Sequence, residues 1–250
     1  MTGAQNDGAL LSLTGITAGY VVDIDVLRDI SLSIEKGRIT GLIGLNGAGK
    51  STLMKTICGF LRPHKGEIRY DGDDITGIPP HTLIDRGIWY IPQESSLFPY
   101  MSVADNLRLP LERLLKPRSG GEIEARLRDA LTRFPALAER LRTPAGNLSG
   151  GQQKMVEFAK AWVVRPRLCL VDEPSVGLAP IVAAEVYRFI ELFASEGMTI
   201  LLVDHNVRRV VKMSEYVYVL SLGEIAARGR REDFEGDLHA QVKAWLGVNF

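Results

Sequence analysis

Hydrophobic residues occur along the chain in short runs and in helical spacings, and together these patterns predict an α/β protein. Two early segments alternate apolar and polar residues, as strands with one covered face do: 11–14 and 30–34. Nearly continuous apolar runs, which are typical of buried strands, make up 39–43, 87–92, 168–173 and 198–203. Two hairpins are also predicted, over 67–72 and over 216–228 with a turn at 221–223.

Apolar residues spaced three and four apart predict two helices in the middle of the chain, over 102–115 and 122–142. Pro110 and Pro135 are expected to break or kink them, because proline has no N–H to donate. Residues 1–9 are expected to form a disordered lead. Further helices are predicted over 53–57, 153–164, 181–195 and, in the tail, 233–246.

Composition limits the classes of protein that this chain can belong to. The 250 residues suffice for one large domain or two small ones, and 30 basic against 30 acidic residues give a net charge of zero. This balance offers no electrostatic footprint for nucleic acid, and no apolar run approaches the ~20 residues of a membrane span. The start lacks the features of a signal peptide, and Cys58 and Cys169 are expected to be buried thiols rather than a disulfide.

A glycine-rich loop lies between the predicted strand 39–43 and the predicted helix 53–57, and it fits the phosphate-loop pattern G-x-x-x-x-G-K-[ST]. Lys50 is expected to neutralise the β- and γ-phosphates of a nucleotide, and Ser51 to complete a magnesium shell. The alternative is a glycine-rich turn with a solvent-exposed lysine, which four matched positions in this context disfavour. The residues that would surround the phosphates are Gly44, Asn46, Gly47, Ala48, Gly49, Lys50, Ser51 and Thr52.

Polar side chains follow three of the predicted buried strands. Gln93 follows 87–92, Asp172 and Glu173 end 168–173, and His205 follows 198–203. Ligands bind at strand ends of this kind in open parallel sheets, so Asp172 is predicted to hold magnesium and Glu173 to deprotonate a water. The alternative for Gln93 is an ordinary loop glutamine. A solvated turn at 172–174 is disfavoured by the buried strand that leads into it, and a structural histidine at 205 by the repeated position at a strand end. Because Glu173 precedes a proline, its backbone is expected to be extended.

Two further positions leave alternatives open. Tyr20, in a predicted loop, either stacks on a purine ring or packs against the protein, and spacing alone does not decide between them. Ser149 with Gly150 and Gly151 either forms a second anion-binding helix start or only caps the helix that follows.

Five motifs together resemble the ATP-binding subunit of an ABC (ATP-binding cassette) transporter, over about 10–246. They match the Walker A loop (44–52), the Q-loop (Gln93), the signature (148–152), Walker B (168–173) and the switch histidine (His205). The resemblance implies an α/β fold: a phosphate-loop ATPase core with a mainly parallel sheet, an N-terminal antiparallel β part and an inserted α-helical subdomain at about 94–164. It also implies a single nucleotide-binding domain over 10–248.

The resemblance further implies ATP and Mg²⁺ as cofactors and a head-to-tail dimer of two ATPase subunits, identical or paralogous. Each ATP would lie between the Walker A loop of one subunit and Ser149, Gly150, Gly151 and Gln152 of the other. Tyr20 falls where the family stacks an aromatic on adenine. Ser51, Gln93 and Asp172 would serve the metal, and Lys50, Glu173 and His205 the catalysis. The implied partners are two membrane permease subunits and, indirectly, a periplasmic solute-binding protein, with the chain on the cytoplasmic face of the inner membrane.

Departures from the common pattern indicate the subgroup. Ala179 stands where most of the family carries Asp, which is similar to ATPases that import branched-chain amino acids or related amides and urea. Segment 203–208 is closer to the ATPase of lipopolysaccharide export, since many amino-acid members carry Glu-Gln at 204–205. A soluble ABC ATPase acting on DNA or ribosomes is a third hypothesis. It is disfavoured because the chain has a single set of these motifs and no long heptad repeat. Import of branched-chain amino acids or related small solutes is the favoured interpretation.

Overall fold

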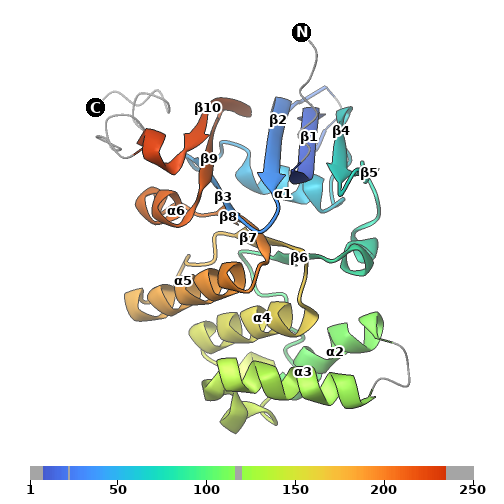
Figure 1. Cartoon of the computed structure of the whole chain (residues 1–250), viewed down its shortest axis with the longest axis vertical. Coiled ribbons are helices and arrows are strands. Elements are labelled where there is room, and N and C mark those ends of the chain that lie inside the picture. The colour runs from blue at the N-terminus through green and yellow to red at the C-terminus, as the bar shows by residue number, and fades with distance from the viewer. Residues whose placement is uncertain (1–7, 22, 116–119, 235–250) are drawn as a thin grey trace.

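The computed structural model describes residues 8–21, 23–115 and 120–234 (Figure 1). The predicted disordered lead is wrong for its last two residues, because Gly8 accepts from the Lys36 N–H at 3.4 Å and the first strand begins at Ala9, which pairs with Glu35. The rest of that lead, 1–7, lies outside the described residues. The predicted tail helix lies outside the described residues except for Asp233 and Phe234, which belong to a short 3-10 turn, η5 (Arg231–Phe234). None of the described helices is long and apolar enough to cross a membrane.

An antiparallel sheet forms one end of the molecule (Figure 1). Its strand order is β2-β1-β4-β5, and every neighbouring pair is antiparallel. The strands are β1 (Ala9–Ala18), β2 (Leu27–Glu35), β4 (Lys65–Tyr70) and β5 (Asp73–Asp74). The predicted β4–β5 hairpin is confirmed, and Asp71 and Gly72 both have positive φ, as its tight turn requires.

A second sheet, mainly parallel, crosses the centre of the molecule. Its order is β10-β9-β3-β8-β7-β6, with only the edge strand β10 antiparallel. The strands are β3 (Ile39–Gly44), β6 (Ile88–Ile91), β7 (Leu168–Asp172), β8 (Thr199–Val203), β9 (Tyr216–Ser221) and β10 (Glu224–Arg230). Each predicted buried strand is confirmed. Because the strands are parallel, the phosphate loop, Gln93, Glu173 and His205 all leave the sheet at the same edge.

Three helices and several turns accompany the central sheet. They are α1 (Lys50–Ile57), α5 (Pro180–Ser195) and α6 (Val207–Met213), with the 3-10 turns η1 (Pro80–Thr82) and η2 (Ile84–Arg86). The helix α6 was not predicted, although Asn206 caps it by accepting from the Arg209 N–H at 3.2 Å. As expected, Cys58 and Cys169 are buried free thiols, and burial raises the pKa of both.

A helical layer lies at the end opposite the antiparallel sheet (Figure 1). It contains α2 (Val103–Leu114), α3 (Gly120–Arg133), η3 (Pro135–Arg140), η4 (Ala145–Asn147) and α4 (Gly150–Val164). A cluster of aromatic rings joins it to α5, with Phe158 5.7 Å from Phe193 and Trp162 5.8 Å from Phe193 between centroids. These helices fall within the predicted 94–164 insertion, and their status as one subdomain stays a prediction.

The two prolines have different effects. Pro135 does end α3, which stops at Arg133 before η3 begins. Pro110, in contrast, lies inside α2 without breaking it. Val103, Leu107 and Leu111 of the same helix are fully buried, so packing of that face offsets the one backbone hydrogen bond that a proline removes.

Candidate functional site

The phosphate loop follows β3 and ends at α1, and its backbone has little room for side chains. A Cβ on Gly44 would lie 2.4 Å from the carbonyl oxygen of Leu220, and Gly49 has a φ of +108°. Gly47 also has a positive φ, +80°. The loop therefore takes a path that only glycine allows, and it leads directly into α1, whose N-cap is Gly49.

Lys50 is almost fully buried, with 4% of its side chain exposed, so the alternative of a solvent lysine is wrong. Its ammonium group donates to the carbonyl oxygens of Gly44, at 3.0 Å, and Leu45, at 3.2 Å. It also lies 3.3 Å from Oε1 of Glu173. The ammonium group is thus held beside the phosphate loop. The carboxylate that it contacts belongs to Glu173, which follows β7, and β8 lies between β7 and β3 in the sheet.

Asp172, the last residue of β7, is only 2% exposed and has one oxygen without a partner. Its Oδ2 accepts from the Tyr90 hydroxyl at 3.0 Å, whereas Oδ1 is buried with no hydrogen-bond partner in the described chain. Burial raises the pKa of Asp172, with the neighbouring Glu173 adding to the effect. A buried oxygen of this kind is suited to a metal ion or to water bound to one. Tyr90 was not predicted as a site residue. Its only signal in the sequence is its position, one residue before the end of a buried strand.

The backbone of Glu173 is not extended, contrary to the prediction from Pro174: its φ is +43°. Its N–H donates to the carbonyl oxygen of Val203 at 2.7 Å, so pairing with β8 overrides the local preference. The turn brings its carboxylate to Lys50 instead of to the opposite face. Backbone conformations this rare cost about 1–3 kcal/mol and persist where the surrounding structure fixes them, often at functional sites.

His205 lies just beyond β8 with about half of its side chain exposed, and its Nδ1 is 3.2 Å from Oδ1 of Asp204. Gln93 is exposed after β6, and its carbonyl accepts from Lys154 of α4 at 3.3 Å. A buried pair of Lys154 and Glu157, 2.8 Å apart, anchors that contact. Both histidine and glutamine therefore lie at the expected edge, while the anchor Lys154 was missed.

Tyr20 is 57% exposed beside the start of α1. Its hydroxyl accepts from Thr52 Oγ1 at 3.4 Å, and the Lys55 ammonium lies 5.4 Å from the ring centroid. So much exposed ring fits poorly with a packing role, and the stacking interpretation stays a prediction.

Ser149 caps α4, which begins at Gly150 rather than at the predicted residue 153. The Ser149 hydroxyl accepts from the Gln152 N–H at 3.4 Å, and the Gln152 side chain accepts from the Ser149 N–H at 3.0 Å. These bonds form a capping box. Gly151 is required for packing, because a Cβ there would lie 2.8 Å from Val182. The capping role is confirmed, and these bonds stay within the turn itself.

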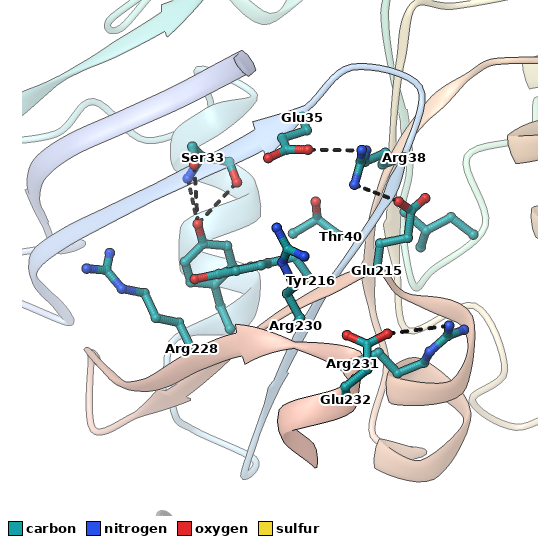
Figure 2. A pocket seen from close by; sticks show the side chains of 12 residues that line it. Ser33, Glu35, Arg38, Thr40, Glu215, Tyr216, Arg228, Arg230, Arg231 and Glu232 are labelled. Atoms are coloured by element: carbon teal, nitrogen blue, oxygen red, sulfur yellow. Dashed lines mark hydrogen bonds and ion pairs between the residues drawn. The ribbon is translucent and has the colours of Figure 1, made fainter. Parts of the chain in front are cut away.

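The cavity in Figure 2 is not part of this site. It has a volume of about 490 Å³ and is lined by residues that include Arg38, Thr40, Tyr216 and Arg228. Thr40 and Tyr216 lie near the amino ends of β3 and β9, whereas the phosphate loop follows the carboxyl end of β3. The chemistry-bearing residues lie instead along the carboxyl edge of the sheet.

Comparison with known proteins gives consistent matches. A family model described as "ABC transporter" matches residues 27–176. The high-affinity branched-chain amino acid transport ATP-binding protein BraG of Pseudomonas aeruginosa is 37% identical over 212 residues, 82% of this chain and 87% of BraG. The lipopolysaccharide export system ATP-binding protein LptB of Escherichia coli is 37% identical over 226 residues, 90% of this chain and 92% of LptB. A crystal structure of the ADP conformation of an ABC transporter's ATP-binding cassette is 30% identical with a TM-score of 0.82, covering 96% of this chain and 99% of that one.

Proposed function

Because the chain belongs to the ABC transporter family, as an ATP-binding subunit that hydrolyses ATP, we propose that it energises import of branched-chain amino acids or related small solutes. The observation that carries the proposed site is the convergence of Lys50, Asp172 and Glu173 at one edge of the parallel sheet. Phosphoryl transfer needs positioning and charge neutralisation more than covalent chemistry, and this edge offers both.

The residues at this edge fit Mg²⁺. They provide the hydroxyl of Ser51, the amide of Gln93 and the buried, unpartnered Oδ1 of Asp172, which are the oxygen ligands that this ion prefers. These three residues would hold the ion, partly through water. When bound, Mg²⁺ supplies positive charge against the phosphate oxygens.

Three residues carry the proposed catalysis. Lys50 neutralises the β- and γ-phosphates from the position where it now contacts Gly44, Leu45 and Glu173. A carboxylate oxygen of Glu173 takes the proton of the attacking water. His205 contacts the γ-phosphate and the opposite subunit. Most of the lowering of the barrier comes from Lys50 and the backbone N–H groups of the loop, which are fixed before the reaction begins.

The proposed assembly is a head-to-tail dimer with itself or with a paralogue. The start of α4 supports it, since Ser149 and Gly150 are exposed and the N-terminus of this 15-residue helix favours an anion. Exposed aromatic residues follow Gln93, with Phe98 50% and Tyr100 97% exposed, and they suit contact with a permease subunit. The proposed location is the cytoplasmic face of the inner membrane, with a periplasmic solute-binding protein as an indirect partner.

Lipopolysaccharide export is the second candidate function. LptB and BraG are equally identical to this chain, at 37%, and Asp204-His205 favours the former while Ala179 favours the latter. Deletion of the gene in the native host should abolish ATP-dependent uptake of labelled leucine and leave lipopolysaccharide at the cell surface. If the deletion strain instead takes up leucine normally and loses lipopolysaccharide from its surface, lipopolysaccharide export would replace amino-acid import as the proposed function.

The nucleotide site is tested by Lys50→Ala. Removal of the cation from the phosphates should abolish detectable ATP hydrolysis and weaken binding of a fluorescent ATP analogue. Lys65→Ala, an exposed lysine on β4, is the matched control and should behave as wild type. Near-normal hydrolysis by Lys50→Ala would contradict the assignment of the site.

A further inference from the structure

Three charged side chains of α4 are buried against the loop that follows β6. They are Lys154, Glu157 and Lys160, spaced three residues apart, and none of them takes part in the proposed chemistry. Lysine and glutamate are rarely this buried unless they are paired. Stability alone explains such a group poorly, since well-packed apolar residues often stabilise a fold as much as a buried ion pair does. Their partners therefore indicate what the burial of charge achieves.

Lys154 and Glu157 form an ion pair that also binds the backbone of this loop. The Lys154 Nζ and the Glu157 Oε2 lie 2.8 Å apart. The same ammonium group donates to the carbonyl oxygens of Pro92, at 3.1 Å, and Gln93, at 3.3 Å. The other carboxylate oxygen of Glu157 accepts from the Ser96 N–H at 2.5 Å. The pair thus satisfies three backbone groups at and near the glutamine.

Lys160 adds a further contact about one turn along α4. Its ammonium group donates to the carbonyl oxygen of Ser96 at 3.2 Å. It also lies 6.0 Å from the ring centroid of Trp89 and 5.9 Å from that of Phe98, close enough for a favourable contact between a cation and each ring. Side chains of one helix therefore bind four backbone groups of 92–96.

The far end of the loop is held by α2. Asn106 is fully buried, and its Oδ1 accepts from the Phe98 N–H at 2.9 Å while its Nδ2 donates to the Phe98 carbonyl oxygen at 3.0 Å. This part of the described chain, 92–98, contains no helix or strand, so side-chain contacts of this kind fix its path. Gln93 therefore follows a strand of the central sheet, but its backbone is bound by the helical layer.

We propose that Lys154, held by Glu157, is a positioning residue for Gln93 and fixes the backbone from which the Gln93 amide reaches the metal site. This rests on the metal role proposed above for Gln93. The glutamine is exposed, so a fixed backbone reduces the conformational freedom that its amide loses when it binds the ion. Because Ser149 begins the same helix, a movement of α4 also moves the support of the glutamine.

Amide hydrogen exchange tests the contact itself, in protein without nucleotide or metal. Lys154→Met/Glu157→Gln removes both charges together, so that no unpaired charge is left buried, and the new glutamine keeps an oxygen for the Ser96 N–H. The amides of 93–98 should exchange faster in this variant than in wild type, while those of β7 should be unchanged. Equal exchange of 93–98 in the two proteins would overturn the proposal.

Metal affinity provides the second readout and does not depend on turnover. Mn²⁺, detected by electron paramagnetic resonance, is titrated into protein saturated with a non-hydrolysable ATP analogue. Affinity for Mn²⁺ should fall about 10-fold in Lys154→Met/Glu157→Gln, and adding this pair of substitutions to Gln93→Ala should cause no further loss. A merely structural ion pair would leave the affinity of the folded variant at the wild-type value, which would overturn the proposal.

A second variant keeps the test usable if the first fails to fold. Glu157→Gln alone removes the charge that holds Lys154 and should give a smaller loss of Mn²⁺ affinity; wild-type exchange and affinity in this variant would also overturn the proposal. Glu122→Gln is the matched control. It breaks an ion pair with Arg126, 2.7 Å long, on the surface of α3 in the same helical layer, and both measurements should match wild type.

Two results separate the possible failures. Losses of Mn²⁺ affinity that multiply when Gln93→Ala is combined with Lys154→Met/Glu157→Gln would show that Lys154 does not act through the glutamine, and would overturn this proposal alone. Unchanged Mn²⁺ affinity in Gln93→Ala would instead remove Gln93 from the metal site of the proposed function, and hydrogen exchange would still decide whether the ion pair holds 93–98.

Discussion

At the scale of single residues, Asp172 and Glu173 show how adjacent carboxylates acquire different environments. Asp172 ends a buried strand and is 2% exposed, whereas Glu173 turns out of the strand with a φ of +43° and meets Lys50. The residue types and their order could be predicted from sequence, because Lys50 and both acids follow a known spacing. The turn could not, since the local rule before Pro174 favours an extended backbone and only the bond to Val203 overrides it.

The burial of Asp172 predicts an unusual pH dependence of stability. Its pKa is raised above the ordinary value of 3.8, so the folded protein holds this proton to a higher pH than the unfolded chain does. The free energy of unfolding should therefore fall as pH rises from 3.8 through the raised pKa.

Asp172→Asn should remove that fall, so its stability relative to wild type should increase as the pH rises from about 4 to about 7. Urea denaturation without nucleotide or Mg²⁺ measures this difference, with the exposed Asp73→Asn as the matched control. An identical pH slope in Asp172→Asn and wild type would contradict the account of this residue.

At the scale of elements, the strands were easier to predict than the helix ends. Every residue of β7 and β8 is buried, so each strand is a continuous apolar run that can be read directly. The start of α4 was placed too late because Gly150 and Gly151 are poor helix formers, although Ser149 and Gln152 carry the spacing of a capping box. Pro110 was expected to break or kink its helix, but α2 continues through it, because packing of the helix outweighs the local preference of proline against a helix interior.

The capping box at Ser149 leads to a prediction about stability. Ser149→Ala removes the acceptor for the Gln152 N–H and should lower the free energy of unfolding by about 1 kcal/mol, the usual cost of losing an N-cap. Chemical denaturation measures the change, and Ser95→Ala in the exposed loop before α2 serves as the control. Equal stability of Ser149→Ala and wild type would show that the box contributes nothing to α4.

At the scale of the whole molecule, the main feature is the separation of the two helix starts that are proposed to bind the nucleotide, at Lys50 and at Gly150. The phosphate loop lies at the edge of the central sheet, and the turn at Ser149 begins a helix of the layer at the far end of Figure 1 from the antiparallel sheet. The layered architecture could be predicted from the resemblance. The support that Lys154 gives to Gln93 could not, because the helical pattern alone does not show that Lys154 and Glu157 of α4 are buried together.

The head-to-tail arrangement predicts a separation between binding and hydrolysis. Ser149→Arg places a large cation at the exposed start of α4 and should block hydrolysis by the dimer while the monomer still binds ATP. Binding of a fluorescent ATP analogue and steady-state turnover measure the two separately, with circular dichroism to confirm folding. Loss of both in a folded variant would place Ser149 in the site of its own subunit.

The central claim is that Glu173 is the general base of an ATPase that works as a dimer, and Glu173→Gln tests it most directly. The amide keeps the size of the side chain and its hydrogen bonding but cannot take the proton, so turnover should fall on the order of 10²–10⁴-fold. Sizing chromatography with ATP and Mg²⁺ should then show an accumulated dimer, while Glu224→Gln, an exposed position on β10, should match wild type. Turnover of Glu173→Gln at the wild-type rate would contradict the account.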